Sequence, residues 1–182
     1  MDFLEKNLED IIMENDNSNL EVRGLHISGK KFRQLNIRGY GVADIVTYQR
    51  IQRSPECNGQ KDLYENEKPS IVVYELKKNK VSVSAFIQAV GYLKGIQRYL
   101  EYRNRCLSDY HFGITLIGSQ IDLNSNVVFL SDVIDGEFGT GGLTVDLYTY
   151  KYGLNGIIFK LHHGYTSLNE NFECGISWRA SK

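Results

Sequence analysis

An acidic and a basic residue end an apolar stretch of this chain of 182 residues. Residues 70–77 read SIVVYELK, in which four residues suited to a buried strand are followed by Glu75 and Lys77. Because residues i and i+2 of a strand face the same side, these two side chains project together and Leu76 points the opposite way. The sequence therefore predicts a carboxylate beside an ammonium group at the end of a core strand.

A second acid, Asp44, lies within the apolar segment VADIV at 42–46. Aspartate is uncommon in strands, and a carboxylate in an apolar run is unfavourable unless it is paired or bound to a cation. If the two strands are neighbours, Asp44 and Glu75 converge, and the backbone carbonyl of Leu76 adds a third oxygen. Mg²⁺ is held by one or two carboxylates and takes further ligands from water and phosphate. The residues thus predict a metal site for phosphodiester hydrolysis, where Lys77 can orient the attacking water or offset negative charge.

The hydrophobic pattern predicts the elements that position these residues. Apolar residues at helical spacing predict helices over 3–14 and 84–103. Apolar or alternating segments bounded by turn residues predict strands, and these are 31–38, 42–49, 70–77, 111–119, 126–134, 143–152 and 156–163.

Three polar segments separate these elements. Residues 15–19 read as a polar turn, and GEFGTGG at 136–142 reads as a flexible turn. Residues 50–69 hold both prolines of the chain and form a loop or insertion longer than most connections. The order of helices and strands predicts a mixed sheet flanked by helices.

Taken in order, these residues resemble the PD-(D/E)XK nuclease superfamily, whose architecture is also called the restriction-endonuclease-like fold. The pattern comprises an acid on the first helix, G-x-x-D at 41–44, E-L-K at 75–77 and Q-x-x-x-Y at 88–92. The resemblance covers about residues 3–118. It implies an α/β (α+β) protein with an αβββαβ core and a mixed central sheet. The whole chain, 1–182, would be one nuclease-like domain, with a β-rich C-terminal extension over about 119–182.

The resemblance also implies a role for each motif residue. Asp44 and Glu75, with the Leu76 carbonyl, would ligate Mg²⁺ or Mn²⁺. Lys77 would be the catalytic lysine, and Gln88 would contact the site or the phosphate.

An acid on the first helix, Glu5 or Glu9, would act through water or a second metal ion. The function that the resemblance implies is metal-dependent hydrolysis of phosphodiester bonds in DNA. Homodimers are common in this family and would bring two sites to one duplex. The alternative on the same fold is a catalytically inactive binding or interaction module in a defence or mobile-element system.

Composition narrows the class of partner. The formal net charge is −1, from 21 basic and 22 acidic side chains, so any DNA contact must come from a local patch. Three cysteines without a CxxC spacing predict free thiols in a reducing compartment. No signal sequence and no apolar run of about 18 residues is visible. We therefore expect a soluble, cytoplasmic protein without a membrane partner.

Structural roles remain open for the same residues. Glu75 and Lys77 can be a surface ion pair of little energetic value, and Asp44 can be satisfied by a backbone N–H. The two acids of the first helix can be solvent-facing groups near a positive helix end. Basic residues between 77 and 105 can form either a solvated face or a phosphate-binding rim. The adjacent His162 and His163 face opposite sides of a strand, so they are poor candidates for ligands of one metal.

Overall fold

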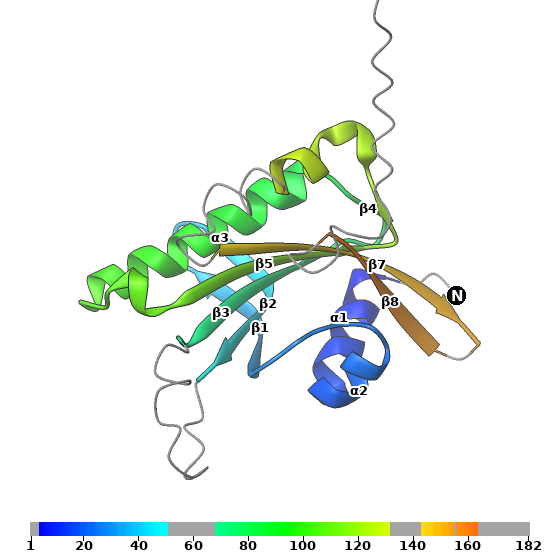
Figure 1. Ribbon diagram of the computed structural model, residues 1–182, viewed down its shortest axis with the longest axis horizontal. Coiled ribbons are helices and arrows are strands. Elements are labelled where there is room, and N and C mark those ends of the chain that lie inside the picture. Colours follow the sequence, from blue (N-terminus) through cyan, green and yellow to red (C-terminus); the bar gives the residue numbers. More distant parts are fainter. Residues whose placement is uncertain (1–3, 51–67, 132–142, 155, 164–182) are drawn as a thin grey trace, which may run out of the picture.

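A six-stranded sheet forms the centre of the protein, with helices on both faces (Figure 1). The computed structural model describes residues 4–50, 68–131, 143–154 and 156–163. The labelled helices are α1 (Glu5–Glu14), α2 (Asn17–Val22) and α3 (Val83–Tyr102), with short 3₁₀ turns at Leu107–Asp109 and Leu123–Ser125. The strands are β1 (Lys30–Ile37), β2 (Gly41–Gln49), β3 (Ser70–Leu76), β4 (Lys80–Val81), β5 (His111–Gly118), β6 (Gln120–Ile121), β7 (Leu143–Gly153) and β8 (Gly156–His163).

The main sheet is mixed, with the strand order β1-β2-β3-β5-β7-β8. Strands β1, β2 and β3 pair antiparallel, β3, β5 and β7 pair parallel, and β8 pairs antiparallel with β7. The parallel step from β3 to β5 is made through α3, as a crossover between parallel strands requires. The mixed sheet with flanking helices confirms the predicted α/β (α+β) class. The C-terminal strands β7 and β8 extend this same sheet.

Two hydrophobic cores lie on the two faces of the sheet. Strand β3 shows the division most clearly, because Ile71 and Val73 belong to the core that contains α3 residues. Tyr74 and Leu76 belong to the core on the other face, with Leu8 and other residues of α1 and α2. The period-two alternation of a strand therefore assigns residue 75 to the α3 face.

The strand predicted over 126–134 is wrong for the residues that can be compared. Residues 127–131 are helical, and residues 132–134 lie outside the described part of the chain. The Leu130 amide donates to the Asn126 carbonyl, and the Ser131 hydroxyl donates to the Val127 carbonyl, as in a helical turn. A short apolar run fits a buried helix as well as a strand, and here fully buried Val127 packs on the α3-side core.

The turn predicted over 15–19 is also partly wrong, because α2 begins at Asn17. Asp16 is its N-cap, and its carboxylate accepts a hydrogen bond from the Asn19 amide. The polar residues are therefore a helix start, for which Asp is well suited. The flexible turn predicted at 136–142 and most of the loop predicted at 50–69 lie outside the described residues.

Within the described ranges, no helix combines the length and the apolar character that crossing a membrane requires.

Candidate functional site

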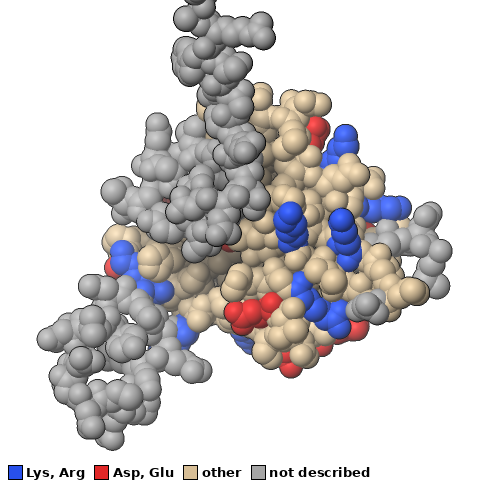
Figure 2. Space-filling view, turned by 45° about the vertical axis from the view of Figure 1, so that its right-hand side comes forward, with Lys and Arg blue, Asp and Glu red and all other residues tan. Residues whose placement is uncertain are grey.

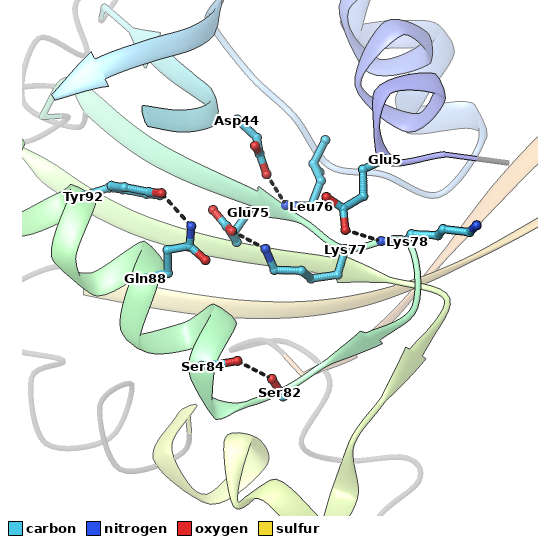
Figure 3. Close-up of polar contacts among 10 residues, drawn as sticks. All are labelled: Glu5, Asp44, Glu75, Leu76, Lys77, Lys78, Ser82, Ser84, Gln88 and Tyr92. Carbon is cyan, nitrogen blue, oxygen red and sulfur yellow. Dashed lines mark hydrogen bonds and ion pairs between the residues drawn. The ribbon is translucent and has the colours of Figure 1, made fainter. Parts of the chain in front are cut away.

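Glu75 and Lys77 form a close pair at the end of β3 (Figure 3). The Lys77 ammonium donates to Glu75 Oε1 at 2.6 Å, as expected for residues two apart on a strand. Glu75 is buried, with 1% of its surface exposed, whereas the Lys77 side chain is 27% exposed. The second oxygen, Glu75 Oε2, is buried and has no hydrogen-bond partner among the described residues. A buried acceptor without a partner is unfavourable, so this oxygen is available to accept a further bond.

Asp44 joins this pair from the neighbouring strand, because β2 and β3 are adjacent and antiparallel. Their backbone pairing ends at Ile45 and Tyr74. Past that point, where Asp44 is next to Ile45 and Leu76 is two residues after Tyr74, the Leu76 amide donates to Asp44 Oδ2 at 2.8 Å. The Asp44 carboxylate thus accepts the hydrogen bond that a backbone carbonyl would accept in a regular sheet. This bond satisfies one carboxylate oxygen, which explains why an acid is tolerated within β2.

The strand geometry changes at Asp44. The β1–β2 pairing skips Asp44 and its opposite residue Gln34, although the pairs on both sides keep one register. Gln34 has a φ of 48°, which is uncommon for a residue other than glycine. Ala43 packs on the α3-side core and Ile45 on the opposite core, whereas residues two apart in a regular strand share a face. This local irregularity re-aims the Asp44 side chain toward the end of β3.

The charges of the site are coupled. Burial raises the pKa of Glu75 to about 7, the hydrogen bond from Lys77 opposes this rise, and the charge of Asp44 adds to it. Burial also raises the pKa of Asp44, against the opposing effects of the Leu76 amide and the Lys77 charge. Burial by itself would lower the pKa of Lys77, but the hydrogen bond to Glu75 and the surrounding acids outweigh it, so that this pKa is raised. A cationic partner for the two carboxylates is therefore favourable.

The two acids of α1 have different surroundings. Glu5 is exposed, and its Oε1 accepts a hydrogen bond from the amide of Lys78, the residue directly after Lys77, at 3.0 Å. Glu9 is buried at 7% exposure, and both of its oxygens have partners in β1. Glu9 Oε1 pairs with the Arg33 guanidinium, and Oε2 accepts from the Gln34 side-chain amide at 2.9 Å.

Gln88 lies on the first half of α3, with its side chain directed toward Glu75 and Lys77 (Figure 3). The residue is exposed, and its Nε2 donates to the Tyr92 hydroxyl at 2.7 Å. Tyr92 is buried, one helical turn further along. The amide of Gln88 is thus held in place on the helix that covers this face of the sheet.

A polar pocket of about 590 Å³ lies beyond Lys77, between the β4–β6 pair and the start of α3. Ser82 is the N-cap residue of α3, and its hydroxyl bonds to that of Ser84 (Figure 3). The lining residues are Asn79, Lys80, Ser82, Ser119, Gln120 and Asp122.

The residues fit a small divalent cation in part. Two electrostatically coupled carboxylates are enough for Mg²⁺, which keeps several waters, and the unpartnered Glu75 Oε2 is an available oxygen. In the described ranges, no group of three or more His, Cys, Asp or Glu side chains is arranged to hold a metal ion. Leu76 contributes its amide to Asp44, and its side chain is in the opposite core at 1% exposure.

The sequence motifs did not include Tyr150, which also reaches the end of β3. Its hydroxyl donates to the Lys78 carbonyl at 2.8 Å, from strand β7. No local pattern distinguishes this tyrosine from its neighbours, because its partner is 72 residues away in the chain.

Comparisons with protein-family models, with curated proteins and with solved structures found no match to this chain.

Proposed function

We propose that this protein is a metal-dependent deoxyribonuclease of the PD-(D/E)XK type, with a restriction-endonuclease-like core. The succession α1, β1, β2, β3, α3, β5 supports the fold part of this proposal; in the described residues the short α2, β4 and the 3₁₀ turn at Leu107–Asp109 lie between its members. The observation that carries the functional part is Glu75 Oε2 beside Lys77 and Asp44, which is buried and has no hydrogen-bond partner in the part of the chain that the structure describes. A structural ion pair would have little reason to leave one carboxylate oxygen buried and unsatisfied.

In this proposal, Asp44, Glu75 and the Leu76 carbonyl would hold Mg²⁺ or Mn²⁺. A divalent cation bound there supplies charge stabilisation at the phosphate and lowers the pKa of a water molecule. The Lys77 ammonium orients the attacking water or offsets the negative charge that develops on the phosphate oxygens.

Two further motif residues would assist. Gln88, exposed and directed toward the pair, would contact the phosphate through its amide. Glu5 would act on the same site through water, because its negative charge raises the pKa values of Asp44, Glu75 and Lys77.

DNA is the proposed substrate, bound through local rather than global charge. Lys94 and Arg98 are exposed on α3, the helix that carries Gln88. Figure 2 shows acidic and basic side chains on one face, with several Lys and Arg side chains gathered on the right-hand part of the view. The net charge of −1 means that such local contacts must provide the phosphate binding.

The test is cleavage of duplex, single-stranded and branched DNA by the purified protein with Mg²⁺ or Mn²⁺. We expect cleavage by the wild type and its loss in Asp44→Asn and Lys77→Met, with circular dichroism unchanged. Silence of the wild type on all three substrates with both metals would contradict the enzyme proposal.

Calorimetric titration with Mn²⁺ separates the enzyme from an inactive binding module on the same fold. We expect binding by the wild type that Glu75→Gln removes and Glu9→Gln retains. Absence of binding by the wild type would favour the inactive module.

A further inference from the structure

The residue that follows the Glu75–Leu76–Lys77 motif is held on both of its backbone polar groups. The Lys78 amide donates to Glu5 Oε1 at 3.0 Å, and the Lys78 carbonyl accepts from the Tyr150 hydroxyl at 2.8 Å. These partners come from α1, at the start of the chain, and from β7, near its end. One residue is thus fixed by side chains from two elements that are distant in sequence.

The chain around Lys78 is also tied to β5 and to the residues just after it. The Lys77 amide donates to the Ile117 carbonyl at 2.7 Å, and the Ser119 amide donates to the Asn79 carbonyl at 2.8 Å. Lys77 lies just beyond β3, where the regular pairing with β5 ends at Leu76 and Ile117. Backbone bonds therefore hold Lys77 and Asn79, whereas the Lys78 amide and carbonyl between them are bonded to side chains.

Tyr150 is well placed for such a role. It is buried at 6% exposure in the core on the α1 side, so its ring is held by packing. Its hydroxyl reaches the segment that carries Lys77, whose ammonium lies 2.6 Å from Glu75 Oε1. A lysine has a long and flexible side chain, so the position of its backbone limits where the ammonium can be.

We infer that Tyr150 is a positioning residue, which holds the Lys78 carbonyl and thereby fixes the Lys77 ammonium against Glu75. This inference rests on the proposed function for its catalytic consequence. It gives the C-terminal strand β7 a part in the site, in addition to its part in the sheet.

The test compares Tyr150→Phe with the matched control Tyr148→Phe. Tyr148 lies on the same strand and packs in the same core at 1% exposure, and the hydrogen bonds described at Lys78 do not involve it. Each substitution removes one buried hydroxyl and keeps the ring. We expect both to lower Tm by a few degrees.

The two variants should differ at the site. Hydrogen exchange followed by mass spectrometry should show faster exchange in the peptide spanning 76–80 for Tyr150→Phe and unchanged exchange there for Tyr148→Phe. For DNA cleavage, Tyr150→Phe should lower kcat about tenfold with KM unchanged, because a misplaced catalytic group weakens only the chemical step. Tyr148→Phe should leave both constants unchanged.

Equal behaviour of the two variants in exchange would overturn the inference, because Tyr150 would then be an ordinary core residue. If the wild type cleaves no DNA, the nuclease proposal fails, and the exchange comparison alone decides whether Tyr150 holds this segment. If exchange rises in Tyr150→Phe while kcat of an active enzyme is unchanged, the hydroxyl does not position Lys77 and the inference is wrong.

Discussion

Among the described residues, two carboxylates are buried, and their oxygens are satisfied in different ways. Glu9 on α1 is 7% exposed, and both of its oxygens accept from β1 side chains, those of Arg33 and Gln34. Glu75 on β3 is 1% exposed, and within the described ranges Oε1 bonds to Lys77 whereas Oε2 has no partner. Both acids contact a basic side chain, so the presence of an ion pair does not separate them.

The difference lies in the oxygen that remains. A buried carboxylate whose oxygens are all bonded is a closed structural unit. A buried carboxylate with an unsatisfied oxygen lowers the stability of the folded protein. This loss is recovered when a ligand binds to that oxygen. We read Glu9 as an ion pair that fastens α1 to β1, and Glu75 as an open position on the α3 face.

The largest expected difference between the two acids is in catalysis. Glu75→Gln keeps the shape of the side chain and removes its charge, so DNA cleavage with Mg²⁺ should fall by roughly 10³-fold. Glu9→Gln should change cleavage by less than about tenfold, because its partners are structural. Single-turnover rates measured with both variants test this, and similar losses in the two would remove the distinction.

The next difference is in the pH dependence of stability without metal. The folded-state pKa of Glu75, about 7, lies above its ordinary value of 4.5, so the folded protein binds this proton more tightly than the unfolded chain. The contribution is fully present below about pH 4.5 and is lost as the pH rises through about 7. A shift of this size corresponds to roughly 3 kcal/mol.

Urea unfolding of the wild type and of Glu75→Gln, at several pH values between 5 and 8, measures this pH-dependent contribution of Glu75 to stability. The free energy of unfolding of the wild type should fall relative to that of Glu75→Gln as the pH rises. If the difference in unfolding free energy between the two proteins stays constant with pH, the pKa of Glu75 is not raised by folding.

A smaller effect on stability is expected when the ion pair between Glu9 and Arg33 is removed. Arg33 pairs with both Glu9 and Asp10, and its side chain is 37% exposed. Glu9→Gln should therefore lower the free energy of unfolding by about 1–2 kcal/mol, between the values for exposed and buried pairs. Urea unfolding at pH 8 checks this, and Glu75→Gln should shift stability in the opposite direction under the same conditions.

The smallest effect concerns Gln88, whose side chain is exposed and bonded to Tyr92. Gln88→Ala should raise KM for DNA a few-fold and leave stability nearly unchanged, because a surface residue of a helix contributes little to folding. Steady-state kinetics measure the first quantity and thermal unfolding the second. Loss of stability without a change in KM would mean that the Gln88–Tyr92 bond is structural.

The local pattern of the sequence was sufficient for most of the elements. The alternation of Glu75, Leu76 and Lys77 predicted a shared side for the acid and the base, and the 2.6 Å contact between them confirms it. The periodicity over 84–103 predicted α3, which spans Val83–Tyr102. The strand predicted from the apolar run at 126–134 was wrong for the described residues 127–131, which are helical. A short apolar run fits a buried strand and a buried helix equally well, and the packing partners decide between the two.

What the sequence by itself determined is the order of most elements, the acid within β2 and the acid and base at the end of β3, since these follow from spacing along one segment. Only the tertiary structure decided which oxygens are satisfied. The Asp44 carboxylate meets the Leu76 amide 32 residues away, and Lys78 meets Glu5 and Tyr150 at separations of 73 and 72 residues. Such contacts depend on how strands and helices are placed against one another, and no periodicity within a segment encodes that placement.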